Sequence, residues 1–181
     1  MAAPINPGSS KAFGREKWIF VPTIANTSAP TTAELTGASA LDVSCYLFDP
    51  NFTRPSQNTN TVTKTRRVCD TVQYSQIGIT QFSGGELTYA FDPQAAALSN
   101  GKKAWEKFGS GAVSATTSGY LVRRNGIDVN TDIAAGQFVD VFPAEIGPGM
   151  PTTVGDGEAA ENAAMHVFTI TAAPAPNKAV V

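Results

Sequence analysis

A long polar tract that follows an apolar strand pattern constrains this fold more than any other feature of the sequence. Residues 40–48 are rich in apolar side chains and predict a β-strand, whereas residues 49–68 are polar and rich in Thr and Asn. A surface loop of that length is uncommon in a compact domain unless it binds a partner or is disordered. The tract is nevertheless β-prone, which favours an extended chain, because it contains Thr59, Thr61, Val62, Thr63 and Thr65.

An extended ribbon with little apolar surface is not stable by itself. A lone two-stranded ribbon is marginal in water and needs a third strand or a packing partner. We therefore expect residues 49–68 to form a β-arm, and we expect its partner to be another subunit.

Length and charge limit the classes of protein. A chain of 181 residues is long enough for one domain with a real hydrophobic core. It has 13 basic and 15 acidic residues, with a formal charge of −2, so a nucleic-acid reader with a basic stripe is not expected. No apolar run is long enough for a membrane span. Residues 1–10 lack the basic and apolar parts of a secretory signal, so we do not expect secretion.

The strand patterns predict a mainly β (α+β) fold. They cover residues 17–22, 41–47, 86–91, 120–124, 137–146 and 165–171. Glycines in residues 78–85 indicate a turn region, Asn125-Gly126 a hairpin turn, and Pro148, Gly149 and Pro151 the end of the strand at 137–146. We expect an antiparallel β-sandwich or partly closed barrel with one flanking helix.

Two segments have helical signals. Residues 32–35 predict a single helical turn that stops before Gly37. Residues 93–107 predict the main helix, with Asp92 as the N-cap and Pro93 at the first helical position. The expected domain covers residues 17–171, preceded by an N-terminal arm at 1–16 and followed by a Pro- and Ala-rich tail at 172–181 that has no partner inside the domain.

The two cysteines have neither metal-ligand spacing nor a C-x-x-C arrangement. Leu41, Val43, Cys45 and Leu47 alternate with polar residues, which places Cys45 on the core face. Cys69 also lies in a strand-like context. We expect two buried thiols, with a disulfide between them as the alternative.

Candidate chemistry is sparse. The single histidine, His166, lies among apolar residues of a predicted strand, which favours a structural role over that of a general base. Without it no Ser-His-Asp or Cys-His site can be built, so we expect no enzymatic activity and no cofactor or metal. Asp156, Glu158 and Glu161 form either a solvated acidic loop or, as the alternative, a divalent cation site.

Two adjacent arginine pairs have two interpretations. They are Arg66-Arg67, at the expected root of the arm, and Arg123-Arg124, at the end of a predicted strand. Isolated pairs in an acidic chain favour salt bridges across a protein interface, and contact with nucleic acid is the alternative.

Six segments, in order and over residues 17–171, resemble the major tail proteins of long-tailed siphophages that infect actinobacteria. They are Leu41–Phe48, Asn51–Thr53, Arg67–Asp70, Glu86–Tyr89, Gly119–Val122 and Phe138–Pro143. The resemblance implies a tail tube protein of the virion, assembled in the bacterial cytoplasm. In such tubes, β-sandwich subunits with a flanking helix form stacked hexameric rings around the channel through which the genome passes.

The resemblance also implies partners and contact residues. The partners are other copies of the chain, the tape measure, terminator and tip proteins, and viral DNA that passes without specific binding; no membrane is implied. Candidate subunit contacts are Phe52, Arg54, Val62, Lys64, Arg66 and Arg67. Because phosphate contacts would retain the genome, the wall should not be basic. The candidate lumen residues are accordingly Asp42, Glu86 and Asp140.

Two other functions fit a β-rich chain with little chemistry. One is a different virion structural protein, such as a capsid decoration protein. The other is a monomeric carbohydrate-binding β-sandwich, in which Trp18 or Trp105 would stack on sugar. The apolar run around Trp18 and the helical segment around Trp105 favour core packing for both side chains instead.

Overall fold

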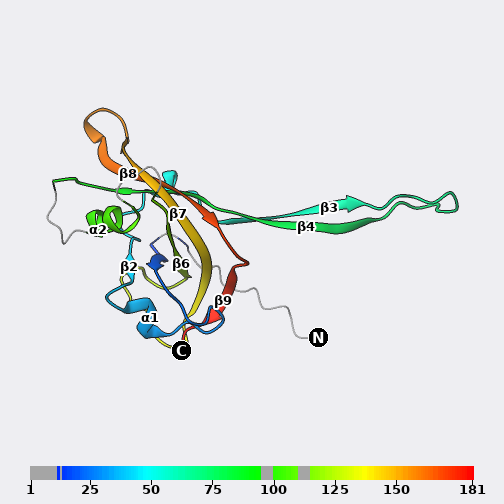
Figure 1. Ribbon diagram of the computed structural model, residues 1–181, viewed down its shortest axis with the longest axis horizontal. Helices are drawn as coiled ribbons and strands as arrows, with labels where there is room; N and C mark the ends of the chain where they lie inside the picture. The colour runs from blue at the N-terminus through cyan, green and yellow to red at the C-terminus, as the bar shows by residue number, and fades with distance from the viewer. Residues whose placement is uncertain (1–11, 13, 95–99, 110–114) are drawn as a thin grey trace, which may run out of the picture.

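The computed structural model describes residue 12 and residues 14–94, 100–109 and 115–181. Its body is a curled antiparallel half-barrel, from which a two-stranded arm projects (Figure 1). This confirms the expected mainly β fold with a flanking helix. The strands of the main sheet are β1 (Glu16–Val21), β2 (Leu41–Asp42), β5 (Gly85–Ala90), β6 (Thr117–Asn125), β7 (Phe138–Val154), β8 (Glu161–Ile170) and β9 (Ala175–Ala179).

The strand order is β2-β1-β6-β7-β8-β5. On one side β7 pairs with β6, and on the other it pairs with β9 at its start and with β8 along the rest of its length. A single chain segment, residues 43–53, links the two ends of this curled sheet. The backbone N–H of Val43 donates to the carbonyl oxygen of Trp18 on β1. The N–H groups of Phe48 and Thr53 donate to the carbonyl oxygens of Thr88 and Glu86 on β5. This segment contains η1 (Asp49–Asn51) and completes the wall that the strands leave open.

Aromatic side chains fill the concave side of the sheet. Trp18, Phe20 and Tyr89 are buried there, and Phe108 at the end of α2 (Asn100–Lys107) packs edge-to-face on Phe20, with ring centroids 5.0 Å apart. Half-buried Trp105 stacks on Phe91. Both tryptophans therefore belong to the core, as predicted.

A second apolar cluster covers the opposite face of β1, β6 and β7. It contains Ile19, Val122 and Val139 from the strands and Leu35 from α1 (Thr32–Thr36). Because β1 is covered on both faces, its apolar side chains are consecutive rather than alternating.

The helix α1 forms where its capping signal predicts. The Thr31 side chain accepts a hydrogen bond from the backbone N–H of Glu34, and the Glu34 carboxylate accepts one from the N–H of Thr31, which is a capping box. Backbone N–H groups of Ala25 and Thr31 hold the pKa of Glu34 below its ordinary value. The helix ends before Gly37, as expected.

The expected strand at 41–47 is wrong beyond Asp42. The Asp42 carboxylate accepts hydrogen bonds from the backbone and side chain of Ser44, and the Ser44 hydroxyl binds the backbone of Trp18. These side-chain bonds replace the ladder and turn the chain. Cys45 is therefore exposed, and so is Cys69; both are free thiols. The predictions of buried thiols and of a disulfide are both wrong.

The C-terminal tail is not free, contrary to prediction. β9 pairs with β7 in the space beyond the end of β8, and Val180 is buried in the second cluster. The backbone of Val181 exchanges hydrogen bonds with Pro30 and Thr32. Backbone pairing and one buried valine thus attach to the body a segment whose Pro- and Ala-rich composition predicted no packing partner. The expected N-terminal arm lies outside the described residues at 1–11 and 13, and Glu16 belongs to β1.

Three turn predictions are also wrong. β7 continues through Pro148 and Pro151. A bulge between Ile146 and Gly149 shifts the register of the β7–β8 ladder, so Pro148 lies at the bulge and pairing resumes at Gly149. Asn125-Gly126 opens a longer loop to β7 rather than a two-residue hairpin. The glycine-containing stretch at 78–85 is mostly strand within the projecting arm, and only Gly84 separates that strand from β5.

The main helix does not start where it was predicted. At Asp92 and Pro93 the chain forms a turn, in which the Asp92 carboxylate accepts a hydrogen bond from the backbone N–H of Gln94, and the described helix α2 covers Asn100–Lys107. Residues 95–99 of the predicted helix lie outside the described residues. Within the described part of the chain, no helix is long and apolar enough to cross a membrane.

Candidate subunit interface

The arm (residues 56–83) is a hairpin that stands apart from the body. β3 (Ser56–Thr63) pairs only with β4 (Ser75–Ser83) among the described strands. Beyond β3, the N–H of Lys64 donates to the carbonyl oxygen of Tyr74, which continues the ribbon towards its tip. At ~3.3 Å per residue, the arm extends about 40 Å from Ser56 to Val68. The arm predicted at 49–68 has different bounds: residues 49–53 lie against the body, where η1 forms and Thr53 bonds to Glu86, and the hairpin runs from Ser56 to Ser83 with a second strand.

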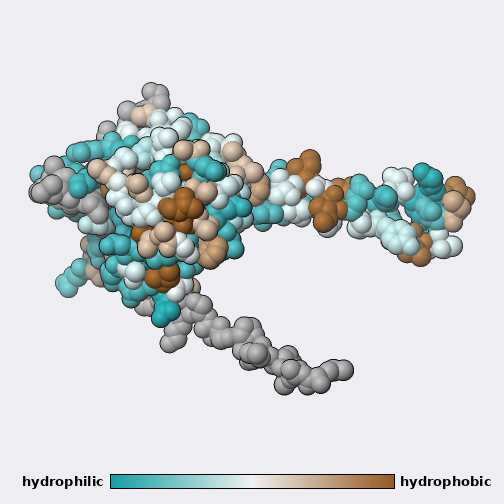
Figure 2. All heavy atoms as spheres, turned by 90° about the horizontal axis from the view of Figure 1, so that it is seen from below, coloured by the Kyte–Doolittle hydropathy of each residue, from teal (hydrophilic) through white to brown (hydrophobic). Residues whose placement is uncertain are grey.

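The arm has almost no shielded surface. All residues of β3 and all of β4 except Gly78 are exposed. Ile77 and Ile79 keep 78% and 74% of their surface in solvent, and Val62, Tyr74 and Phe82 are also exposed. Figure 2 shows hydrophobic residues spread along the arm between polar ones. Exposed apolar surface on a ribbon with no third strand is typical of an element that packs against a partner.

Both faces of the ribbon carry apolar side chains. Ile77 and Phe82 lie opposite Thr61 and Gln57 in the ladder, and Thr61 and Gln57 share one face. On that face the hydroxyl oxygens of Thr59 and Thr80 are 3.0 Å apart. Val62 lies on the other face, opposite Gln76. A partner that covered one face alone would therefore leave apolar side chains in water.

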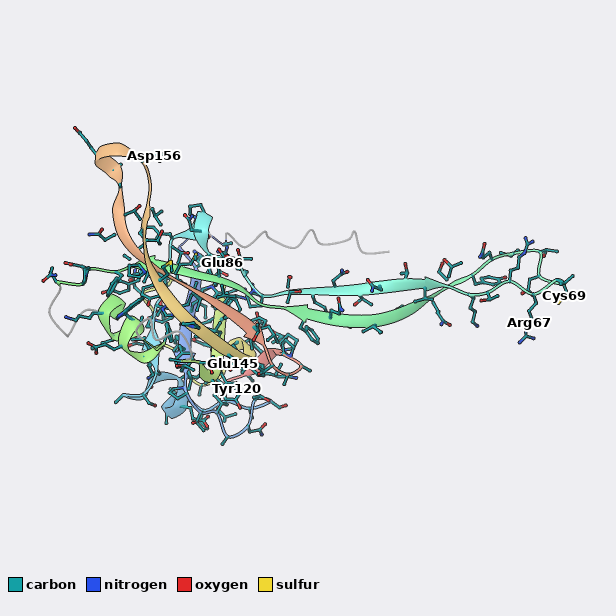
Figure 3. The ribbon with its side chains drawn as sticks, turned by 45° about the horizontal axis from the view of Figure 1, so that its top comes forward. Arg67, Cys69, Glu86, Tyr120, Glu145 and Asp156 are labelled. Carbon is teal, nitrogen blue, oxygen red and sulfur yellow. The ribbon has the colours of Figure 1, made fainter. Side chains whose placement is uncertain are left out.

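The basic residues of the arm are at its tip (residues 64–74), not at its root. Lys64, Arg66 and Arg67 are all exposed there, and Figure 3 shows Arg67 and Cys69 at the far end of the hairpin. The Asp70 carboxylate accepts a hydrogen bond from the backbone N–H of Arg67, and the Arg67 guanidinium forms no ion pair with a described residue. The predicted position of Arg66 and Arg67 at the root was wrong, because the chain returns to the body through the second strand, β4. Residues 64–74 therefore form the turn at the far end of the hairpin.

Phe52 and Arg54, at the root of the arm, contact their own subunit. Phe52 is buried edge-to-face against Trp18, with ring centroids 4.9 Å apart. The Arg54 guanidinium bonds to the Glu16 carboxylate, with Nε 3.0 Å from Oε1, and to Asp49. Burial raises the pKa of Glu16, but the hydrogen bonds and charge of Arg54 outweigh it and hold that pKa below its ordinary value. The two residues fix the base from which the arm projects.

The three candidate lumen residues lie on different strands. Asp42 on β2 forms an ion pair with Lys17 at 3.0 Å. Asp140 on β7 accepts from Arg123 at 2.8 Å and from the backbone N–H of Asn177. Glu86 is exposed on β5 (Figure 3). The structure does not gather them into one cluster.

The second arginine pair stabilises its own subunit. Arg123 forms its ion pair with Asp140, and Arg124 is only 1% exposed. The guanidinium of Arg124 donates to the backbone carbonyl oxygens of Asp128, Thr131 and Asp132. The described partners of this pair are therefore groups of its own chain, and the predicted roles at an interface or on nucleic acid stay predictions.

His166 is fully buried in the aromatic core. Its Nδ1 lies 2.9 Å from the carbonyl oxygen of Gly147, and its Nε2 lies 3.0 Å from the hydroxyl of Tyr89. Since a carbonyl only accepts, Nδ1 carries the proton and Nε2 accepts from Tyr89. Burial lowers the pKa of His166, partly opposed by the bond to Gly147. The predicted structural role is confirmed.

The acidic residues near 160 lie on a second protrusion. Asp156, Glu158 and Glu161 are exposed at the turn between β7 and β8, which contains η2 (Gly157–Ala159). Among the residues that the structure describes, no group of three His, Cys, Asp or Glu side chains is arranged to hold a metal ion. The exposure of all three carboxylates is what a solvated acidic loop requires.

Together, the curled half-barrel and its projecting arm define a small β-rich subunit, and most of the exposed large apolar side chains of the described residues lie on that arm. Residues 3–181 match the family described as phage tail tube protein, so the chain belongs to that family and is a structural protein of phage tails. A solved structure described as the anti-feeding prophage (AFP) baseplate, 6-fold symmetrised, is similar at 7% identity and a TM-score of 0.49, over 95% of each chain. No curated protein sequence matches the chain.

Proposed function

We propose that this protein is the tube subunit itself, which associates into hexameric rings that stack into the hollow conduit for the phage genome. The arm is the observation that carries the proposal, because it exposes apolar side chains on both faces and no described strand of its own chain pairs with it as a third strand. Burying a side chain such as Ile77 or Ile79 stabilises an interface by roughly 1.5–3 kcal/mol each. Contact with a second subunit supplies that burial.

The slightly acidic charge of the chain supports a channel through which DNA passes without being bound. The chain has a slight excess of acidic residues, and Arg123 and Arg124 are held within the subunit by Asp140 and by backbone carbonyl oxygens. A channel wall that carries carboxylates such as Glu86 would not retain phosphates. We therefore keep Asp42, Glu86 and Asp140 as proposed lumen residues. Of the proposed subunit contacts, Val62, Lys64, Arg66 and Arg67 are free to act on the arm, whereas Phe52 and Arg54 act by fixing its base.

The remaining parts of the proposal follow from family membership and from the resemblance to siphophage tail proteins of actinobacteria. The tape measure, terminator and tip proteins would be further partners, and the subunit would be made in the host cytoplasm before it joins the virion. The carbohydrate-binding alternative loses its aromatic platform, because Trp18 is 2% exposed and Trp105 packs on Phe91.

Negative-stain microscopy and light scattering of the purified full chain over a concentration series test the proposal. We expect rings or hollow tubes with a central channel above a threshold concentration. A variant in which a two-residue Asn-Gly turn replaces residues 57–82 is the control, and it should keep the circular dichroism of the body but remain monomeric. A wild-type chain that is monomeric at every concentration would contradict the proposal.

A further inference from the structure

The charge of the chain is divided between the arm and the body. Three of the 13 basic residues and one of the 15 acidic residues lie in the arm, which gives it a formal charge of +2. Because the whole chain carries −2, the rest of it carries −4. The positive charge is concentrated at Lys64, Arg66 and Arg67, none of which forms an ion pair with a described residue.

The acidic charge has its own protrusion. No Lys or Arg occurs between Arg124 and Lys178, a stretch that contains seven acidic residues. Three of these are exposed, Asp156 and Glu158 on the turn between β7 and β8 and Glu161 at the first position of β8, and they form no ion pair with a described residue. We call residues 155–161 the acidic turn.

The two protrusions have matching layouts. The arm leads from exposed Ile79 and Ile77 to a basic tip, and the β7–β8 hairpin leads from exposed Met150 to the acidic turn. Each therefore offers an apolar flank beside a charged end. Apolar contact supplies most of the affinity at such an interface, and opposite charge sets its register and excludes wrong pairings.

The two ends also point away from each other. Figure 3 shows Arg67 at the tip of the arm and Asp156 on the far side of the body. A molecule whose complementary ends lie on opposite sides cannot satisfy both within one chain. It forms head-to-tail contacts, which close into rings or continue as filaments.

We propose that the arm tip of one subunit docks against the acidic turn of a second copy, with Arg66 and Arg67 facing Glu158 and Glu161. This inference rests on the proposed self-association and adds the surface that receives the arm. The contact is heterologous, so every interior subunit donates one arm and receives another.

Charge exchange tests the pairing in the full-length chain. One variant carries Arg66→Glu and Arg67→Glu, and the other carries Glu158→Lys and Glu161→Lys. All four positions are exposed, so both variants should keep the circular dichroism and Tm that the wild type shows below its assembly threshold. A control with Lys103→Glu and Glu106→Lys changes two exposed charges on α2 instead.

Sedimentation velocity then gives the threshold concentration for assembly. We expect each reversed variant alone to raise it by about tenfold or more, and the α2 control to leave it unchanged. An equimolar mixture of the two variants should regain assembly, because each basic end then meets an acidic one. A single chain that carries all four substitutions should regain it too.

The outcomes separate this inference from the proposed function. If the wild type never assembles, the tube function itself is contradicted. If the wild type assembles and either reversed variant assembles equally well, the acidic turn is not the receiving surface. Loss of assembly in both variants without recovery in the mixture or in the fourfold chain would also overturn the pairing.

Discussion

His166 lies directly across the β7–β8 ladder from Gly149, and its imidazole occupies the space that a side chain at position 149 would need. A Cβ atom at that position would lie 2.3 Å from Cε1 of His166 and 2.8 Å from the ring of Trp105. The ring cannot move away, because its nitrogens are bound to Gly147 and Tyr89. The bulge of β7, the glycine and the buried histidine therefore depend on each other.

Gly149→Ala should destabilise the body by about 2–3 kcal/mol, since the new methyl group forces His166 or Trp105 out of a packed core. Urea unfolding measured by circular dichroism gives the difference in free energy. Thr153→Ala is the control, because Thr153 is an exposed residue on the same strand. Equal midpoints for the two variants would show that the His166 ring is free to move.

Acid should weaken the fold in a window that begins at the ordinary pKa of histidine, 6.5. Burial lowers the pKa of His166 in the folded state, so the unfolded chain binds more protons below that pH. The stabilisation is fully present above pH 6.5 and is lost as the pH falls towards the folded-state pKa, with a slope of up to ~1.4 kcal/mol per pH unit.

The chain has one histidine, so His166→Gln isolates this effect. A glutamine amide can donate to Gly147 and its oxygen can accept from Tyr89, but it does not titrate. Unfolding free energies measured between pH 7.5 and 5.5 should therefore decline for the wild type and stay nearly level for the variant. Parallel declines would assign the acid sensitivity to other groups.

The C-terminal strand should contribute to stability through Val180. Val180→Ala removes two buried methylene equivalents from the second apolar cluster and should cost about 2 kcal/mol. Val181→Ala is the matched control, because the neighbouring side chain is exposed. Thermal unfolding of both variants measures the difference. A Val180→Ala chain as stable as the control would mean that the tail is dispensable.

Both thiols should react quickly in the folded subunit. Cys45 and Cys69 are exposed and unpaired, so a chromogenic disulfide reagent should titrate two thiols per chain without denaturant. If the arm tip docks in the assembly, the thiol of Cys69 should become slow to react above the assembly threshold. Cys45→Ser isolates the signal of Cys69. Two thiols that react only after unfolding would contradict the exposed positions.

Local patterns determined several elements of this protein before any tertiary contact was known. The apolar run of β1, the capping box of Thr31 and Glu34, and the alternation of Leu87 and Tyr89 on β5 all depend on neighbours a few residues away. Propensity and short-range hydrogen bonds act at that distance. The polar, β-branched composition of residues 49–68 likewise indicated an extended arm, although the hairpin itself covers residues 56–83.

Tertiary structure decided where those elements end and what they meet. β3 pairs with β4, which places Arg66 and Arg67 at the tip of the arm, and β9 attaches to β7 through pairs such as Val139 with Lys178. Cys45 is exposed because Ser44 bonds to the backbone of Trp18, a residue distant in sequence. Such contacts use backbone N–H and carbonyl groups, which every residue except proline carries in full, so the pattern of side chains does not specify them. Which strand edges are available for pairing is decided only when the whole sheet has formed.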